Sequence, residues 1–538
     1  MKKIFFAIFI IFLSISLYAN DQRIIPLTSD VYDLIDSLSL ETRLGMLSKE
    51  RPYSEAQILS ILNQIDKSKL SDAGVRAVAE IEKIMEKDPL YEEGKFSGDI
   101  SGEIAIEGYL HTSDDESQWQ YNYNDRKAIL TLTFETWLNE NFYAVIEPDL
   151  REDRFVITDT DDNGNYEGNY TNIPSSFGDL NYHFPTRGFF SFGSENWNIQ
   201  IGRDRLEYGN GETGKLLLSS YPDFYDFIKA KCFVKNFAYT YSLIDLESWT
   251  DDDENLRFIS DHALSVRLFE DMLTLSVNES ALFYGEIPTI QYVSPLIIYH
   301  NLIRNHQIGD SIVNICMTLG ANFAPVKGLS FYGEYLLDEI STLLEQEEYG
   351  EDATVTPNAF AFLAGSKLSY PAGPGYISGF LEFVYTSPWC YLLSPEGGSM
   401  IWSHRDANDV TNSRENVKKY LGYEYGPDSM GFGMDAVYMM PTVFKAGLSA
   451  DFIIKGENDY DSEYAETVEN AFMTTPTGTP EYRLILGLFG SYQLFDFLSF
   501  EIDTAWLRIN NYNHVESSLF YDFQTAFSVV FDFSKKVF

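Results

Sequence analysis

The sequence predicts a transmembrane antiparallel β-barrel preceded by an N-terminal α-helical bundle. Three observations predict this fold class: an apolar leader at the N-terminus, a high content of aromatic residues, and a change from helical to two-residue hydrophobic periodicity near residue 98. Aromatic residues make up 15% of the chain, with 36 tyrosines and 40 phenylalanines against 7 tryptophans. Membrane barrels carry such rings in two interfacial girdles that flank an apolar, lipid-facing band.

The N-terminal leader has the pattern of a secretory signal peptide over residues 1–19. Lys2 and Lys3 form its positive region, residues 4–17 form an apolar core too short to span a bilayer comfortably, and Ala19 is a small residue suited to cleavage. We therefore expect an exported protein, with an uncleaved anchor as the alternative. After residue 19 no apolar run approaches the ~20 residues that a membrane helix requires.

A periplasmic helical bundle is predicted over residues 28–88. Ser29, Ser54 and Ser71 each precede a segment of helical periodicity, and Gln57 completes a capping box with Ser54. Apolar residues recur at three- and four-residue intervals in the three segments: Val31, Leu34, Ile35 and Leu38; Ile58, Ile61, Leu62 and Ile65; and Val75, Val78, Ile81 and Met85. Helices this short cannot bury such stripes alone, so we expect them to pack together and to dock at the mouth of the barrel.

The barrel itself is predicted over residues 98–538, where apolar and polar residues alternate. Ile104 and Ile106, for example, alternate with Glu103 and Glu107. The last segment alternates in the same way: Phe523, Thr525, Phe527, Val529, Phe531 and Phe533 share one face, and Gln524, Ser528 and Asp532 the other. A soluble β-sandwich shows the same alternation, but not strand after strand with aromatic ends. At roughly 22–28 residues per strand with its turn and loop, this length predicts ~16–20 strands.

The formal net charge of −43 excludes nucleic acid as a natural partner, because phosphate binding requires clustered lysine and arginine. The acidic surplus gathers in stretches such as 251–254 and 345–352, which we interpret as solvated loops. Loops that hold divalent cations or repel an anionic polymer are the alternative. Cys232, Cys316 and Cys390 allow at most one disulfide and lack the spacing of a metal site, so we interpret them as small apolar residues on barrel strands.

The segment 208–219, YGNGETGKLLLS, has the spacing of a phosphate-binding loop at Gly209, Gly214 and Lys215. A working loop of this kind opens a helix and places a hydroxyl on Mg²⁺ directly after the lysine. The residue after Lys215 is Leu216, and an exported protein works where ATP is absent. We therefore predict that the glycines form a turn or bulge inside the barrel rather than a nucleotide site.

An acidic stretch at 159–165 matches the first half of a calcium-binding loop, D-x-D-x-N-G. Asp159, Asp161 and Asn163 would supply oxygen ligands, and Gly164 permits the sharp turn. The twelfth position holds Tyr170, where such a loop has glutamate. We interpret the stretch as an acidic hairpin loop without bound metal, with a structural Ca²⁺ site as the alternative, and we expect no other cofactor.

No catalytic residues are predicted, and we expect that the protein is not an enzyme. Its seven histidines are scattered along the chain, and neither an H-E-x-x-H pair nor a G-x-S-x-G turn occurs. An outer-membrane hydrolase that brings serine and histidine together across strands is the alternative.

Several stretches, met in this order along the chain, are similar to the Wzi capsule-assembly family of outer-membrane proteins. They are VYDLIDSLSLETRLG and RPYSEAQILSIL within 31–62, IGRDRLEYGNGETGKLLLS at 201–219, HALSVRL at 262–268, ALFYGEIPTIQYVSPLIIYH at 281–300, GLSFYGEYLLDE at 328–339 and YLGYEYGPDSM at 420–430. In the family, the glycine-rich segment commonly holds tryptophan and proline where this chain has Leu206 and Glu212. The resemblance covers most of the mature chain.

The resemblance implies a barrel of about 18 strands that is plugged by its own loops and carries a periplasmic helical bundle. It also implies a lectin-like role, in which the protein binds, retains or helps to assemble capsular polysaccharide at the cell surface. The expected partners are therefore surface polysaccharide and outer-membrane lipid, together with the barrel-insertion machinery, which recognises a terminal aromatic residue such as Phe538. A porin-like channel for small solutes is the alternative function.

Polysaccharide binding uses aromatic faces that stack on the apolar patches of sugars, and polar groups that bond to hydroxyls. The predicted aromatic cluster is Trp119, Tyr121 and Tyr123 in the stretch QWQYNYND. An interfacial girdle is the alternative for these rings. The predicted cationic and polar residues near the glycine-rich segment are Arg203, Arg205, Tyr208 and Lys215.

Overall fold

The computed structural model describes residues 22–47, 49–86, 91–93, 96–113, 118–139, 141–154, 170–174, 178, 180–181, 185–247, 255–286, 290–299, 312–339, 355–393, 396–408 and 413–533. The predicted signal peptide, the predicted calcium ligands Asp159, Asp161 and Asn163, and the terminal Phe538 lie outside the described residues.

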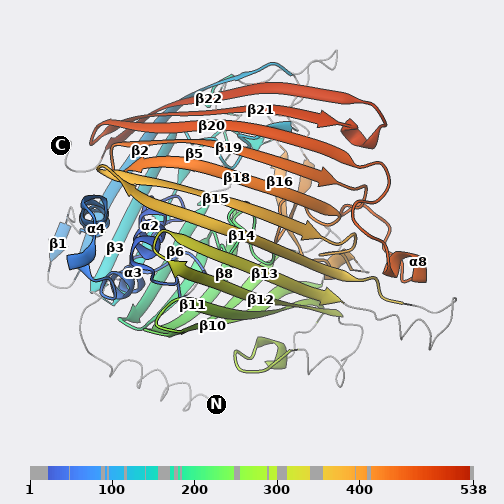
Figure 1. The fold of residues 1–538 in the computed structure, drawn as a ribbon, viewed down its shortest axis with the longest axis horizontal. Helices are drawn as coiled ribbons and strands as arrows, with labels where there is room; N and C mark the ends of the chain where they lie inside the picture. The colour runs from blue at the N-terminus through green and yellow to red at the C-terminus, as the bar shows by residue number, and fades with distance from the viewer. Residues whose placement is uncertain are drawn as a thin grey trace.

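The strands form a closed antiparallel barrel of 18 strands (Figure 1). In ring order they are β2 (Phe96–His111), β3 (Leu130–Asn139), β4 (Phe142–Glu147), β6 (Arg187–Ser194), β7 (Trp197–Asp204), β8 (Tyr225–Val234), β9 (Phe237–Leu246), β10 (Leu256–Leu268), β11 (Leu273–Gly285), β12 (Ile312–Val326), β13 (Leu329–Glu339), β14 (Ala359–Ala372), β15 (Gly375–Thr386), β18 (Ser429–Met440), β19 (Phe444–Lys455), β20 (Glu481–Phe495), β21 (Leu498–Asn510) and β22 (Leu519–Phe533). β22 pairs with β2 from Gly102↔Phe533 to His111↔Gln524, so the ring closes without a free edge.

Shorter elements accompany the ring. β1 (Tyr91–Glu93) pairs with the start of β2, and β5 (Asp149–Leu150) pairs with β3. β16 (Ile401–Asn408) and β17 (Ser413–Tyr420) form a separate hairpin in the connection between β15 and β18. Among the described residues, the other helical turns include η1 (Lys67–Lys69), η4 (Ile290–Val293), η5 (Glu396–Gly398), α8 (Val468–Ala471) and η6 (Tyr512–His514).

Side chains alternate between the lumen and the outer surface along the strands, as the sequence predicts. In β22, Gln524 and Ser528 are buried inside, whereas Phe523 is 47% exposed on the outer face. In β2, Glu107 is buried inside and Ile106 is exposed outside. Because apolar side chains cover the outer face of strand after strand, this face has the chemistry of a lipid-contacting surface.

The two ends of the barrel differ in the length of their connections. Turns of two to four residues join β6 to β7, β8 to β9, β10 to β11 and β14 to β15 at one end, while long connections such as 205–224 and 387–428 leave the other end. Three helices lie at the short-turn end: α2 (Val31–Thr42), α3 (Glu55–Leu62) and α4 (Asp72–Met85) (Figure 1). Among the described residues, no helix has the length and apolarity needed to cross a membrane.

The helices are bound to the short turns and to the wall. Gly45 N donates to Asp271 O and Gly328 N donates to Leu40 O, both at 2.8 Å. The apolar core of the helices includes Tyr376 of β15. The predicted docking of the helices at one mouth of the barrel therefore agrees with the structure.

Two of the three predicted helix caps are confirmed. Ser54 Oγ accepts from Gln57 N at 3.3 Å, and Ser71 Oγ accepts from Gly74 N at 3.1 Å. The cap position of α2 is Asp30, and Ser29 Oγ instead accepts from Val31 N at 3.3 Å, because the helix starts one residue later than the Ser29 cap requires.

Two other predictions are wrong in detail. Val75 is 54% exposed, because α4 packs through the small residues Ala73 and Ala77 beside Val78 and Ile81. Cys390 lies in the connection after β15 rather than on a strand. All three cysteines are free thiols, and Cys390 is buried in the apolar cluster that fills the lumen on this side.

Candidate functional site

The connection between β7 and β8, residues 205–224, folds back into the barrel; we call it the lumenal segment. No helix follows its glycines. Its backbone pairs with itself, where Tyr208 N donates to Leu218 O at 2.8 Å, and with the N-terminal region, where Arg51 N donates to Glu207 O at 2.9 Å. The structure therefore agrees with the prediction that the glycines form a turn inside the barrel.

Two buried carboxylates of the barrel wall hold the lumenal segment in place. Glu334 of β13 accepts from Asn210 N at 2.9 Å. Glu382 of β15 accepts from Glu212 N at 2.7 Å and from Thr213 N at 3.0 Å, and also from the Thr213 hydroxyl. The wall thus binds the backbone of the glycine-rich turn directly.

The glycines of the turn are required by its backbone and its neighbours. Gly209 has φ of +120°, a conformation that side chains with a Cβ rarely adopt. A Cβ at Gly214 would lie 2.5 Å from Cδ2 of Tyr423, in the connection that precedes β18. These two glycines therefore serve close packing inside the barrel.

The connection between β15 and β18 covers the lumenal segment. Tyr391 Oη donates to Leu216 O at 2.7 Å, and Ser219 N donates to Leu421 O at 2.7 Å. Both connections contribute to one apolar cluster that also takes in wall residues such as Leu336. The lumen is consequently occupied by segments of the chain itself.

A polar cavity of about 500 Å³ remains between these segments. It is lined by four cations, four carboxylates, three amides and four hydroxyls: Lys49, Arg51, Arg205 and Lys215; Asp125, Glu207, Glu212 and Glu424; Gln120, Asn122 and Asn124; and Thr213, Ser219, Ser220 and Tyr221. A second cavity of about 240 Å³ shares Gln120, Thr213 and Glu424 with it, so the two adjoin. A lining with many hydrogen-bond donors and acceptors, and with charges of both signs, suits a neutral, hydroxyl-rich ligand.

The charged side chains that line the cavity influence one another's protonation. Lys215 Nζ lies 3.1 Å from Glu207. Burial alone would raise the pKa of Glu207, but Lys215 and Arg51 outweigh it and hold that pKa below its usual value. Burial, together with the negative charges of Asp451 and Asp125, raises the pKa of Glu424 to about 7.

Asp36 of α2 anchors the cations on the helix side of the cavity. It accepts from Arg51 at 3.1 Å and from Lys367 of β14 at 2.8 Å, and Lys49 lies 3.8 Å away. Burial opposes the ionised carboxylate, yet the three cations hold the pKa of Asp36 well below its usual value. Burial lowers the pKa of Lys49 to about 8. Lys367 also donates to Glu212 at 2.9 Å, which links α2 to the lumenal segment.

The predicted residues of the glycine-rich region separate into three places. Arg205 and Lys215 line the large cavity. Tyr208 is buried, bonds through its hydroxyl to Ser242 at 2.6 Å, and lines a separate cavity of about 20 Å³, enough for about one water molecule. Arg203 is paired with Asp226 at 2.7 Å at the end of β7, on the opposite face of the strand from Asp204.

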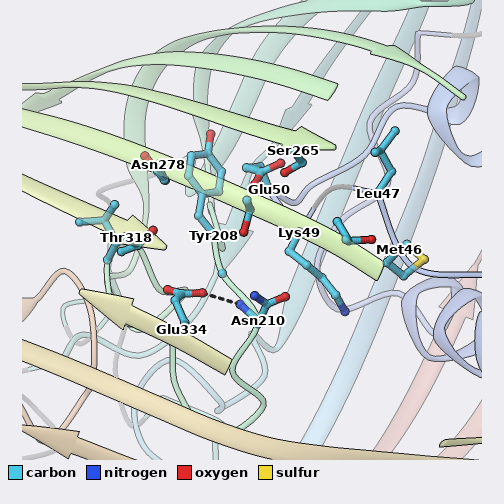
Figure 2. A pocket seen from close by; sticks show the side chains of 14 residues that line it. Met46, Leu47, Lys49, Glu50, Tyr208, Asn210, Ser265, Asn278, Thr318 and Glu334 are labelled. Carbon is cyan, nitrogen blue, oxygen red and sulfur yellow. Dashed lines mark hydrogen bonds between the residues drawn. The ribbon is translucent and has the colours of Figure 1, made fainter. Parts of the chain in front are cut away.

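Figure 2 shows the small cavity around Tyr208. The segment after α2, with Met46 and Glu50, faces wall side chains such as Asn278 and Thr318 across it. The bond from Asn210 to Glu334 closes one side. This cavity is thus a packing defect between the helices, the lumenal segment and the wall.

The predicted aromatic cluster packs inside the barrel. Trp119 stacks on the Arg126 guanidinium at 3.9 Å, Tyr121 Oη donates to Glu107 at 2.7 Å, and Tyr123 Oη accepts from Asn181 at 2.7 Å. These rings therefore do not form an outer girdle. Their contacts are with other side chains of the protein, and the rings do not line the cavity.

The amides that alternate with these rings line the cavity instead. Gln120, Asn122 and Asn124 occupy the intervening positions of QWQYNYND. Sequence reasoning missed them, although the strict alternation of amide and ring in this stretch is a signal that one side faces water. Ser220, Tyr221 and Glu424 had no such signal, because distant connections bring them to the cavity.

Within the described residues, no group of three or more histidine, cysteine, aspartate or glutamate side chains is placed to hold a metal ion. The calcium ligands suggested by the sequence lie outside that part of the chain, so a Ca²⁺ site there stays a prediction.

No protein-family model matches this sequence, and no curated protein sequence matches it. Among solved structures, the chain is similar to Wzi, an outer-membrane protein involved in group 1 capsule assembly in Escherichia coli and described as a carbohydrate-binding β-barrel. The identity is 13%, the match covers 95% of this chain and 99% of Wzi, and the TM-score is 0.61.

More distant likenesses are to OccD3 and to the outer-membrane channel DcaP. OccD3 of Pseudomonas aeruginosa is 8% identical over 84% of this chain and 97% of its own, with a TM-score of 0.42. DcaP of Acinetobacter baumannii is 9% identical over 83% of this chain and 100% of its own, with a TM-score of 0.37. The closed ring, its apolar outer face and the likeness to Wzi show that the protein is an outer-membrane β-barrel.

Proposed function

We propose that the protein is a non-enzymatic outer-membrane lectin that binds surface polysaccharide, and capsular polysaccharide in particular, through the polar cavity in its lumen. The observation that carries the proposal is the cavity itself: about 500 Å³, lined by amides, hydroxyls and charges of both signs, in a lumen filled by the chain's own connections. A few sugar residues fit such a volume, and their hydroxyls need donors and acceptors together.

The proposal includes an orientation. Outer-membrane barrels place short turns in the periplasm and long loops outside the cell. On this rule α2, α3 and α4 are periplasmic, and the connections that bear Asn122, Ser220 and Glu424 open toward the cell surface. A polysaccharide chain would then reach the cavity from outside.

The test compares the amide side of the QWQYNYND stretch with its aromatic side. Asn122→Ala removes a group that lines the cavity, and we expect about tenfold weaker binding of the purified full-length protein to polysaccharide from its own source, since one or two lost hydrogen bonds are worth about 1–2 kcal/mol. Titration calorimetry in detergent measures this affinity.

Trp119→Ala serves as the matched control, because Trp119 packs on Arg126 and does not line the cavity. We expect it to lower stability more than affinity. If both variants bind as the parent does, the cavity is not the glycan site; if neither parent nor variants bind any polysaccharide, the lectin proposal fails.

A porin-like channel for small solutes is the second candidate. The two adjoining cavities, of about 500 and 240 Å³, favour it, because they would form part of a path through the lumen if the lumenal segment moved aside. Conductance in a planar bilayer separates the two functions.

A further inference from the structure

Residues 290–299, which include η4, lie on the outside of the barrel wall; we call them the strap. In Figure 1 they form the olive-green coil outside the ribbons of β10 and β12. The wall residues beneath the strap belong to the outer face: Ser260 and His262 of β10 share the parity of Leu264, which is exposed outside, while Asp261 points inward and accepts from the Ser280 hydroxyl at 2.5 Å.

Side chains of the wall bind the backbone of the strap. Tyr239 Oη donates to Pro295 O, and Tyr241 Oη donates to Val293 O at 2.8 Å. Glu279 of β11 accepts from Tyr299 N at 2.9 Å. Polar side chains of the wall that would otherwise face outward thus form hydrogen bonds with the backbone of this irregular stretch.

Tyr299 closes the contact at the end of the strap. Its hydroxyl lies 2.6 Å from Ser260 Oγ, and its ring stacks on His262 with centroids 4.9 Å apart. It also covers Ala281 and Ile315, and the three make a small buried cluster on the outer face. His262 Nε2 in turn lies 2.8 Å from Glu279, so this hydrogen-bonded pair lies next to the strap rather than on bare wall.

The strand register gives the height of the strap in the membrane. Arg203, Asp226 and Asp245 stand side by side on β7, β8 and β9 and form a charged row on the outer face. The row of Tyr241 and His262 is four residues nearer the short turns, which is about 13 Å along a strand and about 10 Å in height at the tilt of a membrane barrel.

The next row toward the short turns is apolar, with Leu264, Val277 and Leu319 exposed outside. The polar groups under the strap therefore lie between the charged row and apolar wall, inside a band that is about 25 Å tall in such barrels. Irregular backbone is tolerated at that depth only when its polar groups are satisfied, and charged side chains there need a cover.

We propose that the strap lies within the hydrocarbon region of the leaflet nearer the long loops and is the lipid-contacting surface of this sector of the barrel. Its partner is the acyl chains of that leaflet. The outward side of the strap supports this partner, because Leu296 is 85% exposed and Ile298 is 60% exposed, and the segment 290–299 carries no charge. The wall beneath supplies the hydrogen bonds, and the strap supplies the apolar contact.

The test measures the surroundings of Leu296 directly. In a Cys232→Ser background, which removes the exposed native thiol, Leu296→Cys is spin-labelled in the full-length protein and reconstituted in vesicles of phosphatidylcholine and phosphatidylglycerol. Collisions with oxygen report hydrocarbon, and collisions with a water-soluble nickel complex report water. Leu264→Cys on the bare wall and Val515→Cys in the exposed connection after β21 are the two references.

We expect the label at position 296 to behave as the label at 264, with high oxygen and low nickel accessibility. Nickel accessibility equal to that at 515 would mean an aqueous loop and would overturn the proposal. Low accessibility to both reagents would overturn it too, because it would mean that a protein, such as a second copy of the chain, covers the strap.

A second variant tests how the strap is held. Tyr239→Phe combined with Tyr241→Phe removes both phenol donors to the strap and keeps the rings. We expect nickel accessibility at position 296 to rise toward the value at 515. Tyr482→Phe, an outward tyrosine on β20, is the matched control and leaves it unchanged. An unchanged label in the double variant contradicts the assignment of these phenols as the groups that hold the strap.

Discussion

Glu55 in α3 shows how burial changes the protonation of a single carboxylate. Its side chain is 2% exposed and lies 3.3 Å from the Arg23 guanidinium, which also lies 3.2 Å from Glu135. Burial raises the pKa of Glu55 to about 8, although Arg23 opposes the shift. The carboxyl therefore binds its proton more tightly in the folded helices than in the unfolded chain.

The sign of the resulting pH dependence follows from that difference. The contribution of Glu55 to stability is full below its unfolded pKa of about 4.3 and is lost progressively as the pH rises toward 8. Glu55→Gln should therefore stabilise the helices by on the order of 1–3 kcal/mol at pH 8 relative to the parent, with little difference at pH 4. Hydrogen exchange of the α3 amides measures this opening free energy, and a parent whose α3 is equally protected at both pH values would contradict the prediction.

At the scale of elements, Asp36 joins α2 to the barrel and to the lumenal segment. It is buried and bound by Arg51 and Lys367, and Lys367 reaches on to Glu212. Asp33, on the same helix, is about half exposed and binds only Lys445 at 2.6 Å among the contacts described. The two carboxylates thus have similar partners in different surroundings.

Asp36→Asn should loosen the helices by about 3–5 kcal/mol, because it removes the buried carboxylate that three cations share. Asp33→Asn is the matched control and should cost less than about 1 kcal/mol, because the exposed pair is screened by water. Limited proteolysis of the folded protein in the stretch between α2 and α3 reports the difference. Equal resistance of the two variants would show that Asp36 does not anchor the helices.

The lumenal segment is held by the wall in the same manner, through Glu334 and Glu382. Both carboxylates accept from backbone donors more than 120 residues away in sequence, so this contact exists only after the ring has formed. The strap depends on the wall likewise. Elements that look like loops in the sequence are thus ordered by the strands around them.

For the whole molecule, the occupied lumen predicts low conductance. The parent should pass little current in a planar bilayer, whereas Glu334→Ala combined with Glu382→Ala should raise the conductance several-fold, because the lumenal segment loses four hydrogen bonds to the wall. Asp503→Ala, on the inner wall of β21 and away from the segment, is the control. A large, sustained current through the parent would favour the channel over the lectin.

Periodicity in the sequence predicts the barrel well, because the side-chain period of a strand is two and lipid demands an apolar face at every second residue. It predicts the outward position of Phe523 and the inward position of Gln524 without any tertiary information. Local hydrogen bonding likewise predicts the caps at Ser54 and Ser71. Helical periodicity fails at Val75, because α4 packs on α2 and the wall through a face with smaller residues.

The site is predicted only in part. Arg205 and Lys215 are found from their place in the glycine-rich segment, and both line the cavity. The QWQYNYND stretch is found as well, but its amides face the cavity where its rings were expected to bind sugar. Which side of an irregular stretch faces inward depends on partners such as Glu107 and Asn181, and no local period carries that information.

The sequence alone predicts the features that depend on neighbours along the chain: the alternating strands, the capped helices and the acidic net charge. Only the folded structure shows what occupies the lumen and where the polar cavity lies. It also shows that an uncharged strap covers His262 and Glu279 on the outer wall. The physical reason is that these features are made by hydrogen bonds and packing between distant segments, whose free energy appears only when the barrel closes.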